Sequence, residues 1–149
     1  MKKNYSSHKH SKWTLLFLFL CIGHSAKADY PIFWQRYTAD PSGIEYNGRL
    51  YLFCSHDTYN VERGYGYFMN DITCISTDDM KNWTDHGEVF HAKDSKWGAK
   101  MTWAPCVVHR NGKFYLYYGD ANSGGIGVAV SDLPTGPYID NHDRPVVGM

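Results

Sequence analysis

One frame of residues occurs twice in this 149-residue sequence, 64 positions apart. In each copy a proline lies in an extended run, an Asn-Gly dipeptide ends that run, and a second run rich in aromatic residues follows. Pro41 and Asn47-Gly48 form the first copy, and Pro105 and Asn111-Gly112 form the second. Asn-Gly between two runs of strand-forming residues predicts a tight hairpin, because both residues tolerate the positive φ angles of a type I′ turn. The sequence therefore predicts a repeated β-unit.

The rest of the sequence after residue 28 is also typical of an all-β protein. Its apolar runs are short, rich in Tyr, Phe, Val and Ile, and bounded by Gly, Asn, Asp and Pro, with no sustained helical spacing. Strands are predicted at 38–45, 50–56, 71–76 and 86–91, then at 103–109, 113–119 and 126–131, with a short one at 137–140. Loops are predicted at 63–69 and 94–100.

Four antiparallel strands that repeat after about 60 residues favour a β-propeller. The alternative is a single β-sandwich in which the repeat arose by chance. We favour the propeller because the proline, turn and strand-end signals all recur in register. A propeller needs about four or more blades to close. Because residues 29–149 hold about two four-stranded blades, we expect them to be the N-terminal part of a truncated propeller domain.

The first 28 residues have the pattern of a secretory signal peptide. Lysines precede an apolar run from Trp13 to Ile22, and Ala26-Lys27-Ala28 fits a small-x-small cleavage site. The apolar run is too short to span a membrane. The sequence therefore predicts cleavage after Ala28 and a secreted or periplasmic mature chain.

Removal of this segment changes the charge balance. It takes away five of the 15 lysines and arginines and none of the 15 acids, which leaves a net charge of −5. That charge disfavours nucleic acid or an anionic membrane as a partner of the mature chain, because both call for clustered cations. A neutral substrate fits better. Nothing in the sequence indicates an oligomeric state.

The cysteines and histidines do not suggest a metal site or a cofactor. Cys54, Cys74 and Cys106 remain in the mature chain, and an odd count with wide spacing argues against a disulfide framework or a zinc site. Cys54 and Cys74 either pair across neighbouring strands or, as we favour, act as small buried hydrophobic residues. The eight histidines show no metal-ligand spacing, so we expect no metal and no cofactor.

Seven motifs in order carry a family resemblance. They are Ala39-Asp40-Pro41, Tyr46 to Leu52, Ser76 to Trp83, Trp103-Ala104-Pro105, Asn111 to Tyr117, Ile126 to Asp132 and Pro134 to Tyr138. Together they cover essentially all of 29–147, and the chain resembles glycoside hydrolase family 43. The resemblance implies a five-bladed propeller that hydrolyses arabinose- or xylose-containing polysaccharides with inversion, as an α-L-arabinofuranosidase, a β-xylosidase or an endo-arabinanase. The expected partner is therefore an oligo- or polysaccharide.

The resemblance also implies three carboxylates. Asp40 matches the general-base aspartate, and the second aspartate and the glutamate acid are expected beyond Met149, so the chain alone is expected to be inactive. The repeat supports a special role for Asp40, because Ala104 stands at the equivalent place in the second copy. A general base must be ionised and hydrogen-bonded in a polar setting. The alternative is an aspartate that hydrogen-bonds its own turn.

Aromatic residues are candidates for sugar binding, because sugars stack their C–H faces on aromatic rings. Trp103, at the start of the strand at 103–109, is predicted to line the pocket, with packing between blades as the alternative. Phe33 and Trp34 are predicted either to form the pocket rim or to pack.

Polar residues at strand ends are further candidates. His56 and Asp57 end the strand at 50–56 and are predicted to hydrogen-bond sugar hydroxyls, with an ordinary strand-end turn as the alternative. Asp120 ends the matching strand of the second copy, and there we favour a solvated loop.

The segment Ser76–Trp83 also resembles the aspartate box of sialidases, although Met80 replaces its glycine. In either family this hairpin is structural and lies away from the pocket.

Two other functions are considered beside the hydrolase. One is a non-catalytic carbohydrate-binding propeller that uses aromatic residues without an acid pair. The other is a sialidase-like enzyme, which needs several arginines that converge on a carboxylate. The mature chain has only five arginines: Arg36, Arg49, Arg63, Arg110 and Arg144. The sialidase is therefore the weaker alternative.

Overall fold

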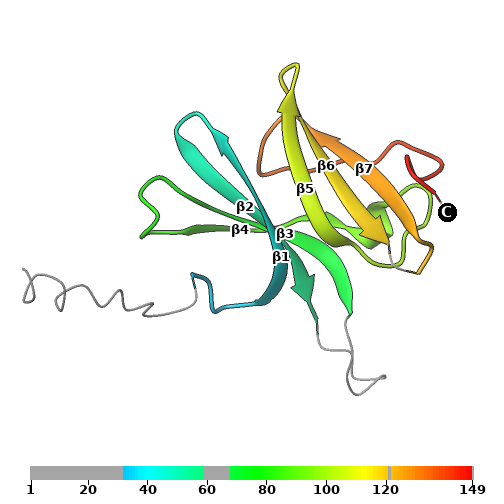
Figure 1. The fold of residues 1–149 in the computed structure, drawn as a ribbon, viewed down its shortest axis with the longest axis horizontal. Coiled ribbons are helices and arrows are strands. Elements are labelled where there is room, and N and C mark those ends of the chain that lie inside the picture. Colours follow the sequence, from blue (N-terminus) through cyan, green and yellow to red (C-terminus); the bar gives the residue numbers. More distant parts are fainter. Residues whose placement is uncertain (1–31, 59–67, 121, 149) are drawn as a thin grey trace, which may run out of the picture. The chain divides into compact units, whose positions relative to one another are not determined.

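The computed structural model describes residues 32–58, 68–120 and 122–148, which form two antiparallel sheets (Figure 1). The first sheet contains β1 (Tyr37–Tyr46), β2 (Arg49–Asp57), β3 (Met69–Thr77) and β4 (Thr84–His91) in chain order. The 3-10 helix η1 (Ala92–Asp94) then leads to the second sheet of β5 (Trp103–Arg110), β6 (Lys113–Asp120) and β7 (Gly125–Ser131). The predicted signal peptide and most of the predicted loop at 63–69 lie outside the described residues.

Seven of the eight predicted strands are confirmed, each within two residues of its predicted ends. The prediction at 137–140 is wrong as a strand, because only Ile139 forms an isolated bridge, with Val130 of β7. Pro137 cannot donate a backbone hydrogen bond. Tyr138 donates its N–H to Val89 of β4 at 3.2 Å, in the first sheet. The segment therefore divides its hydrogen bonds between the two sheets and does not extend the second.

Both Asn-Gly dipeptides form the predicted hairpins. The φ angles are 53° at Asn47 and 77° at Gly48, and 52° at Asn111 and 74° at Gly112. Two consecutive positive φ angles define the type I′ turn that joins twisted antiparallel strands.

The two proline motifs form β-bulges. The pairing of β1 with β2 shifts between Ala39 and Ser42, and the pairing of β5 with β6 shifts between Trp103 and Cys106. At the centre of each bulge the backbone is left-handed, with φ of 52° at Asp40 and 43° at Ala104. A bulge takes residues out of the ladder and redirects a side chain. The backbone feature is therefore present in both repeats, although the carboxylate is present in only one.

The hydrophobic core lies between the two sheets. Phe53, Ile72 and Cys74 of the first sheet share one buried cluster with Phe114 and Leu116 of the second. In addition, β5 contacts β1 more than β2, and β2 more than β3. The sheets therefore meet mainly through their first strands, as neighbouring propeller blades do around a central axis.

The strand register shows why the cysteines do not pair. Cys54 lies opposite Thr73, and Cys74 lies opposite Phe53. Since opposite residues share a face and successive residues alternate, the two thiols point to opposite faces of the sheet. Both are buried free thiols, as is typical of small hydrophobic residues, and Cys106 is exposed and free.

Within the described ranges, the fold contains no helix of the length and hydrophobicity needed to cross a bilayer.

Candidate active site

Asp40 stands in the bulge of β1 with its side chain exposed. Ser55 of β2 donates a hydrogen bond from its hydroxyl to Asp40 Oδ2 at 3.2 Å. Across residues 32–58, 68–120 and 122–148 this is the one side-chain hydrogen bond that Asp40 makes, so its partner comes from the neighbouring strand and not from its own turn. The alternative of a self-bonded turn is therefore not what the structure shows.

Ser55 also joins the two sheets. Its side chain is completely buried, and its Oγ accepts a hydrogen bond from the backbone N–H of Ala104 at 2.9 Å. Ala104 is the residue at the centre of the second bulge. The two equivalent bulges therefore meet at one serine hydroxyl.

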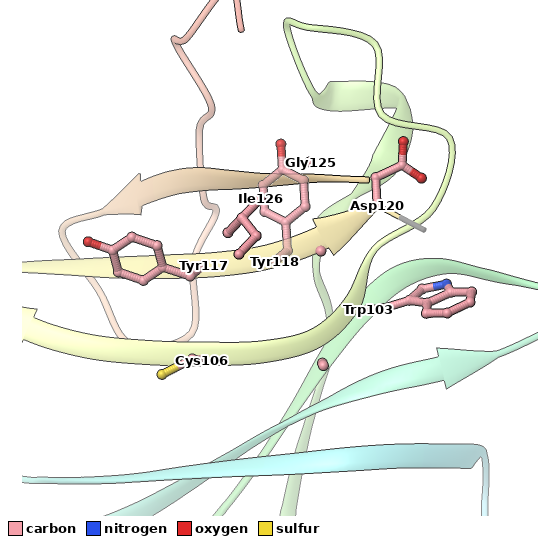
Figure 2. Close-up of a pocket in the computed structure, with 9 residues that line it drawn as sticks. Trp103, Cys106, Tyr117, Tyr118, Asp120, Gly125 and Ile126 are labelled. Atoms are coloured by element: carbon pink, nitrogen blue, oxygen red, sulfur yellow. The ribbon is translucent and has the colours of Figure 1, made fainter. Parts of the chain in front are cut away.

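Trp103 lines a pocket of about 400 Å³ on the second sheet (Figure 2). The other lining residues are Ala104, Cys106, Tyr117, Tyr118, Gly119, Asp120, Gly125 and Ile126. The indole Nε1 of Trp103 is buried and has no hydrogen-bond partner in the described part of the chain. Buried donors are normally satisfied, so this N–H is open to a further acceptor. The predicted sugar contact of Trp103 stays a prediction.

His56 lies on the face of the first sheet opposite to that of Ser55, because neighbours in a strand alternate. Its Nδ1 is 3.0 Å from both carboxylate oxygens of Asp71, which lies directly opposite in β3 and is 5% exposed. Because an ionised carboxylate only accepts, Nδ1 donates its proton to Asp71. Asp57 is half-buried at the end of β2. The structure thus brings His56 to Asp71 and not to Asp40, and sugar binding by His56 and Asp57 stays a prediction.

The two aromatic residues before β1 differ in exposure. Trp34 is 81% exposed and so does not pack against the described residues, whereas Phe33 is half-buried. A place on the pocket rim stays a prediction for both.

Asp120 is not in a solvated loop, and that prediction is wrong. It is 2% exposed and accepts hydrogen bonds from the backbone N–H groups of Lys100, Met101 and Asn122 at 3.2, 3.3 and 3.1 Å. Residues 95–102 form no strand, so they need acceptors other than a sheet ladder. The Asp120 carboxylate supplies them and fastens the connection between the sheets.

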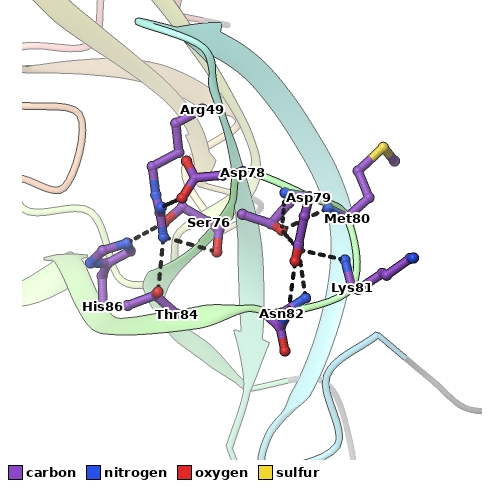
Figure 3. A network of polar contacts seen from close by, with 10 residues as sticks. Arg49, Ser76, Asp78, Asp79, Met80, Lys81, Asn82, Thr84 and His86 are labelled. Atoms are coloured by element: carbon purple, nitrogen blue, oxygen red, sulfur yellow. Dashed lines mark hydrogen bonds and ion pairs between the residues drawn. The ribbon is translucent and has the colours of Figure 1, made fainter.

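The hairpin at 76–83 is held by a network of polar contacts (Figure 3). Asp79 accepts hydrogen bonds from the N–H groups of Lys81 and Asn82 at 2.9 and 2.7 Å, and these bonds hold the pKa of Asp79 well below its usual range. Met80, at the glycine position of the aspartate box, has a φ of 58°. The backbone there is the one that glycine would favour.

Arg49 ties this hairpin to the start of β2. It donates to Ser76 Oγ and Thr84 Oγ1, both at 2.8 Å, and pairs with Asp78 (Figure 3). Since Arg49 begins β2 and Ser55 lies near its end, the network is at the other end of the strand from Asp40.

No group of three or more His, Cys, Asp or Glu side chains in the described ranges is arranged to hold a metal ion.

The chain matches the family model described as "Glycosyl hydrolases family 43" over residues 29–148. Xylosidase/arabinosidase 43A of Humicola insolens is 39% identical over 129 residues, which are 79% of this chain and 39% of the relative. An arabinoxylan arabinofuranohydrolase of Paenibacillus polymyxa is 42% identical over 137 residues, which are 78% of this chain and 21% of the relative.

Solved structures give the same result. An alpha-L-arabinofuranosidase from Clostridium thermocellum is 62% identical with a TM-score of 0.65, and the match covers 81% of this chain and 40% of that one. A family 43 enzyme from Xanthomonas citri, in complex with xylose, is 36% identical with a TM-score of 0.68, over 79% of this chain and 35% of that one. This chain therefore spans at most about two fifths of the length of these proteins. The β-propeller fold class is confirmed. Because the family match runs through both sheets, from residue 29 to residue 148, the chain belongs to glycoside hydrolase family 43.

Proposed function

We propose that this chain carries the general base of an inverting glycoside hydrolase that acts on arabinose- or xylose-containing plant polysaccharides. The observation that carries the proposal is Asp40, an exposed carboxylate held by Ser55 in a bulge whose counterpart in the second sheet has no carboxylate. The names of the relatives, which include xylosidases and arabinofuranohydrolases, support this substrate class.

In the proposed reaction Asp40 takes a proton from a water molecule as the water attacks the anomeric carbon. The glycosidic C–O bond breaks on the opposite face of the sugar, and a carboxylic acid protonates the leaving oxygen. In inverting enzymes these two carboxyl groups stand about 6.5–9.5 Å apart, which leaves room for the water. We place this acid outside the described residues, since this chain spans only 39% of the Humicola relative.

The test is Asp40→Asn in the protein encoded by the complete reading frame. Because a positioned base contributes about 10²–10⁴-fold, the rate of hydrolysis of aryl arabinofuranosides and xylosides should fall by that factor. NMR of the first product should show inversion at the anomeric carbon. The matched control is Asp132→Asn, an exposed acid paired with Lys113 on the second sheet, and it should keep the wild-type rate.

The binding-module alternative makes a different prediction. In a non-catalytic propeller the wild type shows no turnover, and Asp40→Asn leaves sugar binding unchanged in titration calorimetry. The sialidase alternative loses support, because Arg36 pairs with Asp85 and Arg49 with Asp78. These two arginines are engaged in contacts within the first sheet.

We also propose that the chain is exported and cleaved after Ala28. The support is the lysine-rich start and the apolar run of residues 13–22. Expression in a host with a secretion pathway, followed by N-terminal sequencing, should give a mature chain that starts at Asp29. Retention of residues 1–28 in the exported protein would contradict the proposed cleavage.

A further inference from the structure

Ser55 makes two hydrogen bonds that fix the direction of its own proton. The N–H of Ala104 can only donate, so Ser55 Oγ is the acceptor of the 2.9 Å contact between them. The single hydroxyl proton is then available for the Asp40 carboxylate, 3.2 Å away. Two consecutive hydrogen bonds therefore link the backbone of the second sheet through Ser55 to Asp40.

The burial of Ser55 reserves its hydroxyl proton for Asp40. The residue is 0% exposed, so water does not compete for its hydroxyl, whereas the Asp40 side chain is exposed. A hydrogen bond to a charged group from a buried, oriented donor is stronger than one between neutral groups. Ser55 thus holds one oxygen of the carboxylate and leaves the other to face solvent or substrate.

The internal repeat supplies a control for this pairing. At the same offset of 64 residues, Asp40 corresponds to Ala104 and Ser55 corresponds to Gly119. The registers agree, because Ser55 lies opposite Ala39 and Gly119 lies opposite Trp103. The carboxylate and the hydroxyl are therefore both present in the first sheet and both absent from the second.

Among the described residues, no contact requires a glycine at residue 119. Its φ is outside the left-handed region, and a Cβ there would meet only the carbonyl oxygen of Trp103, at an ordinary contact distance of 3.7 Å. The hydroxyl of Ser55 is thus not a general feature of this strand position, and it accompanies the carboxylate.

We propose that Ser55 is a positioning residue for Asp40, which it orients through the packing of the two sheets. The proposal rests on the proposed role of Asp40 as general base. It adds that the geometry of the base depends on Ala104, a residue of the neighbouring sheet. Since Ser55 does not touch the reacting atoms, its loss should affect the rate of reaction and not the binding of the sugar.

The experiment compares Ser55→Ala, Ser55→Gly and Ser55→Thr in the protein from the complete reading frame. Ser55→Gly copies the residue of the second sheet and guards against misfolding of the alanine variant. We expect kcat to fall about ten- to hundredfold in the alanine and glycine variants, with KM unchanged, because a small misplacement of a catalytic group costs up to about 10²-fold. Ser55→Thr keeps the hydroxyl and should recover most of the lost rate.

Ser76→Ala is the matched control. Ser76 is also 0% exposed, and it hydrogen-bonds Arg49 and His86 at the other end of the sheet. Ser76→Ala should lower the free energy of unfolding and leave kcat unchanged. In an Asp40→Asn background, Ser55→Ala should cause no further loss of rate, because the group that it orients is already gone.

The outcomes separate this inference from the proposed function. If the wild type hydrolyses glycosides but Ser55→Ala keeps its kcat, or loses no more than Ser76→Ala does, the role of Ser55 is wrong and the proposed function stands. If the wild type hydrolyses nothing, the proposed function fails. The Ser55–Asp40 pair is then decided by a double-mutant cycle on urea unfolding. A coupling between Ser55→Ala and Asp40→Asn supports the pair, and additive effects overturn it.

Discussion

Asp40 and Ala104 have the same left-handed backbone and different side chains. An aspartate tolerates positive φ, but an alanine in that region is strained by about 1–2 kcal/mol, because its Cβ crowds the following carbonyl. Ala104 nevertheless has a φ of 43° and directs its N–H at Ser55. The second bulge therefore stores backbone strain next to the candidate site.

This strain predicts that Ala104→Gly stabilises the protein. Glycine removes the strain that the Cβ of Ala104 causes at positive φ, and this gain outweighs the extra entropy of glycine in the unfolded chain. The free energy of unfolding should therefore rise by about 0.5–1 kcal/mol. The matched control is Ala39→Gly, at an ordinary strand position beside the first bulge, which should lower it by about 0.5–1 kcal/mol. Urea denaturation measures both. If Ala104→Gly lowers the free energy of unfolding as much as Ala39→Gly does, the backbone at Ala104 is not strained.

At this scale the sequence led to Asp40 but not to its partners. Asp40 stood out because one repeat has an acid where the other has alanine. Ser55 carries the same signal, since Gly119 stands at its equivalent place in the repeat. Asp71 had no such signal, because its contact with His56 arises only from the pairing of β2 with β3. The burial of Asp120 has no local signal, because an acid at a strand end can either face solvent or accept hydrogen bonds from a buried loop.

The first sheet is held at the hairpin between β3 and β4 by a polar network. Ser76 Oγ accepts a hydrogen bond from Arg49 Nε at 2.8 Å and lies 2.6 Å from His86 Nε2, with which it forms a second hydrogen bond. Burial, and then the charge of Arg49, lower the pKa of His86 from its usual 6.5, while Asp85 opposes them.

This lowered pKa predicts a loss of stability in acid. The folded chain resists a proton that the unfolded chain accepts, so the contribution of His86 is complete above pH 6.5 and declines as the pH falls below that value. Urea unfolding at several pH values should show the decline in the wild type and less of it in His86→Gln. His109→Gln, on the second sheet, is the matched histidine control and should retain the decline. An unchanged pH profile in His86→Gln would rule out the assignment.

Most elements were predictable because their signals are local. The Asn-Gly turns and the alternating aromatic runs determine seven strands with little help from tertiary contacts. The segment at 137–140 was not predictable in this way. Its backbone partners, Val130 and Val89, belong to different sheets, and a local pattern does not indicate such a division.

The whole chain presents two sheets that meet through β1 and β5, and each sheet also has a face away from that contact. On the second sheet Val108, Tyr117 and Ile126 are 42%, 38% and 40% exposed. These side chains alternate along their strands with core residues such as Val107 and Leu116. Contiguous apolar surface of this kind usually packs against another element or a partner.

We predict that the 149-residue chain alone does not hydrolyse glycosides. The family resemblance assigns it one of three carboxylates, and it spans 40% of the Clostridium thermocellum enzyme. An inverting reaction needs the acid as well as the base. The purified chain should release no arabinose or xylose from arabinoxylan, by chromatography of reducing sugars, under conditions where the protein from the complete reading frame does. Measurable release by the chain alone would contradict this prediction.

The twofold occurrence of the bulge has a consequence for protein engineering. Ala104 already has a left-handed backbone like that of Asp40, and a Cβ at residue 119 would meet only an ordinary contact among the described residues. Ala104→Asp with Gly119→Ser would therefore place the acid and the hydroxyl on the second bulge, and a backbone donor from a further sheet would still be needed to orient the hydroxyl as Ala104 orients that of Ser55. A repeat scaffold of this kind offers a second, preformed acceptor position for new chemistry.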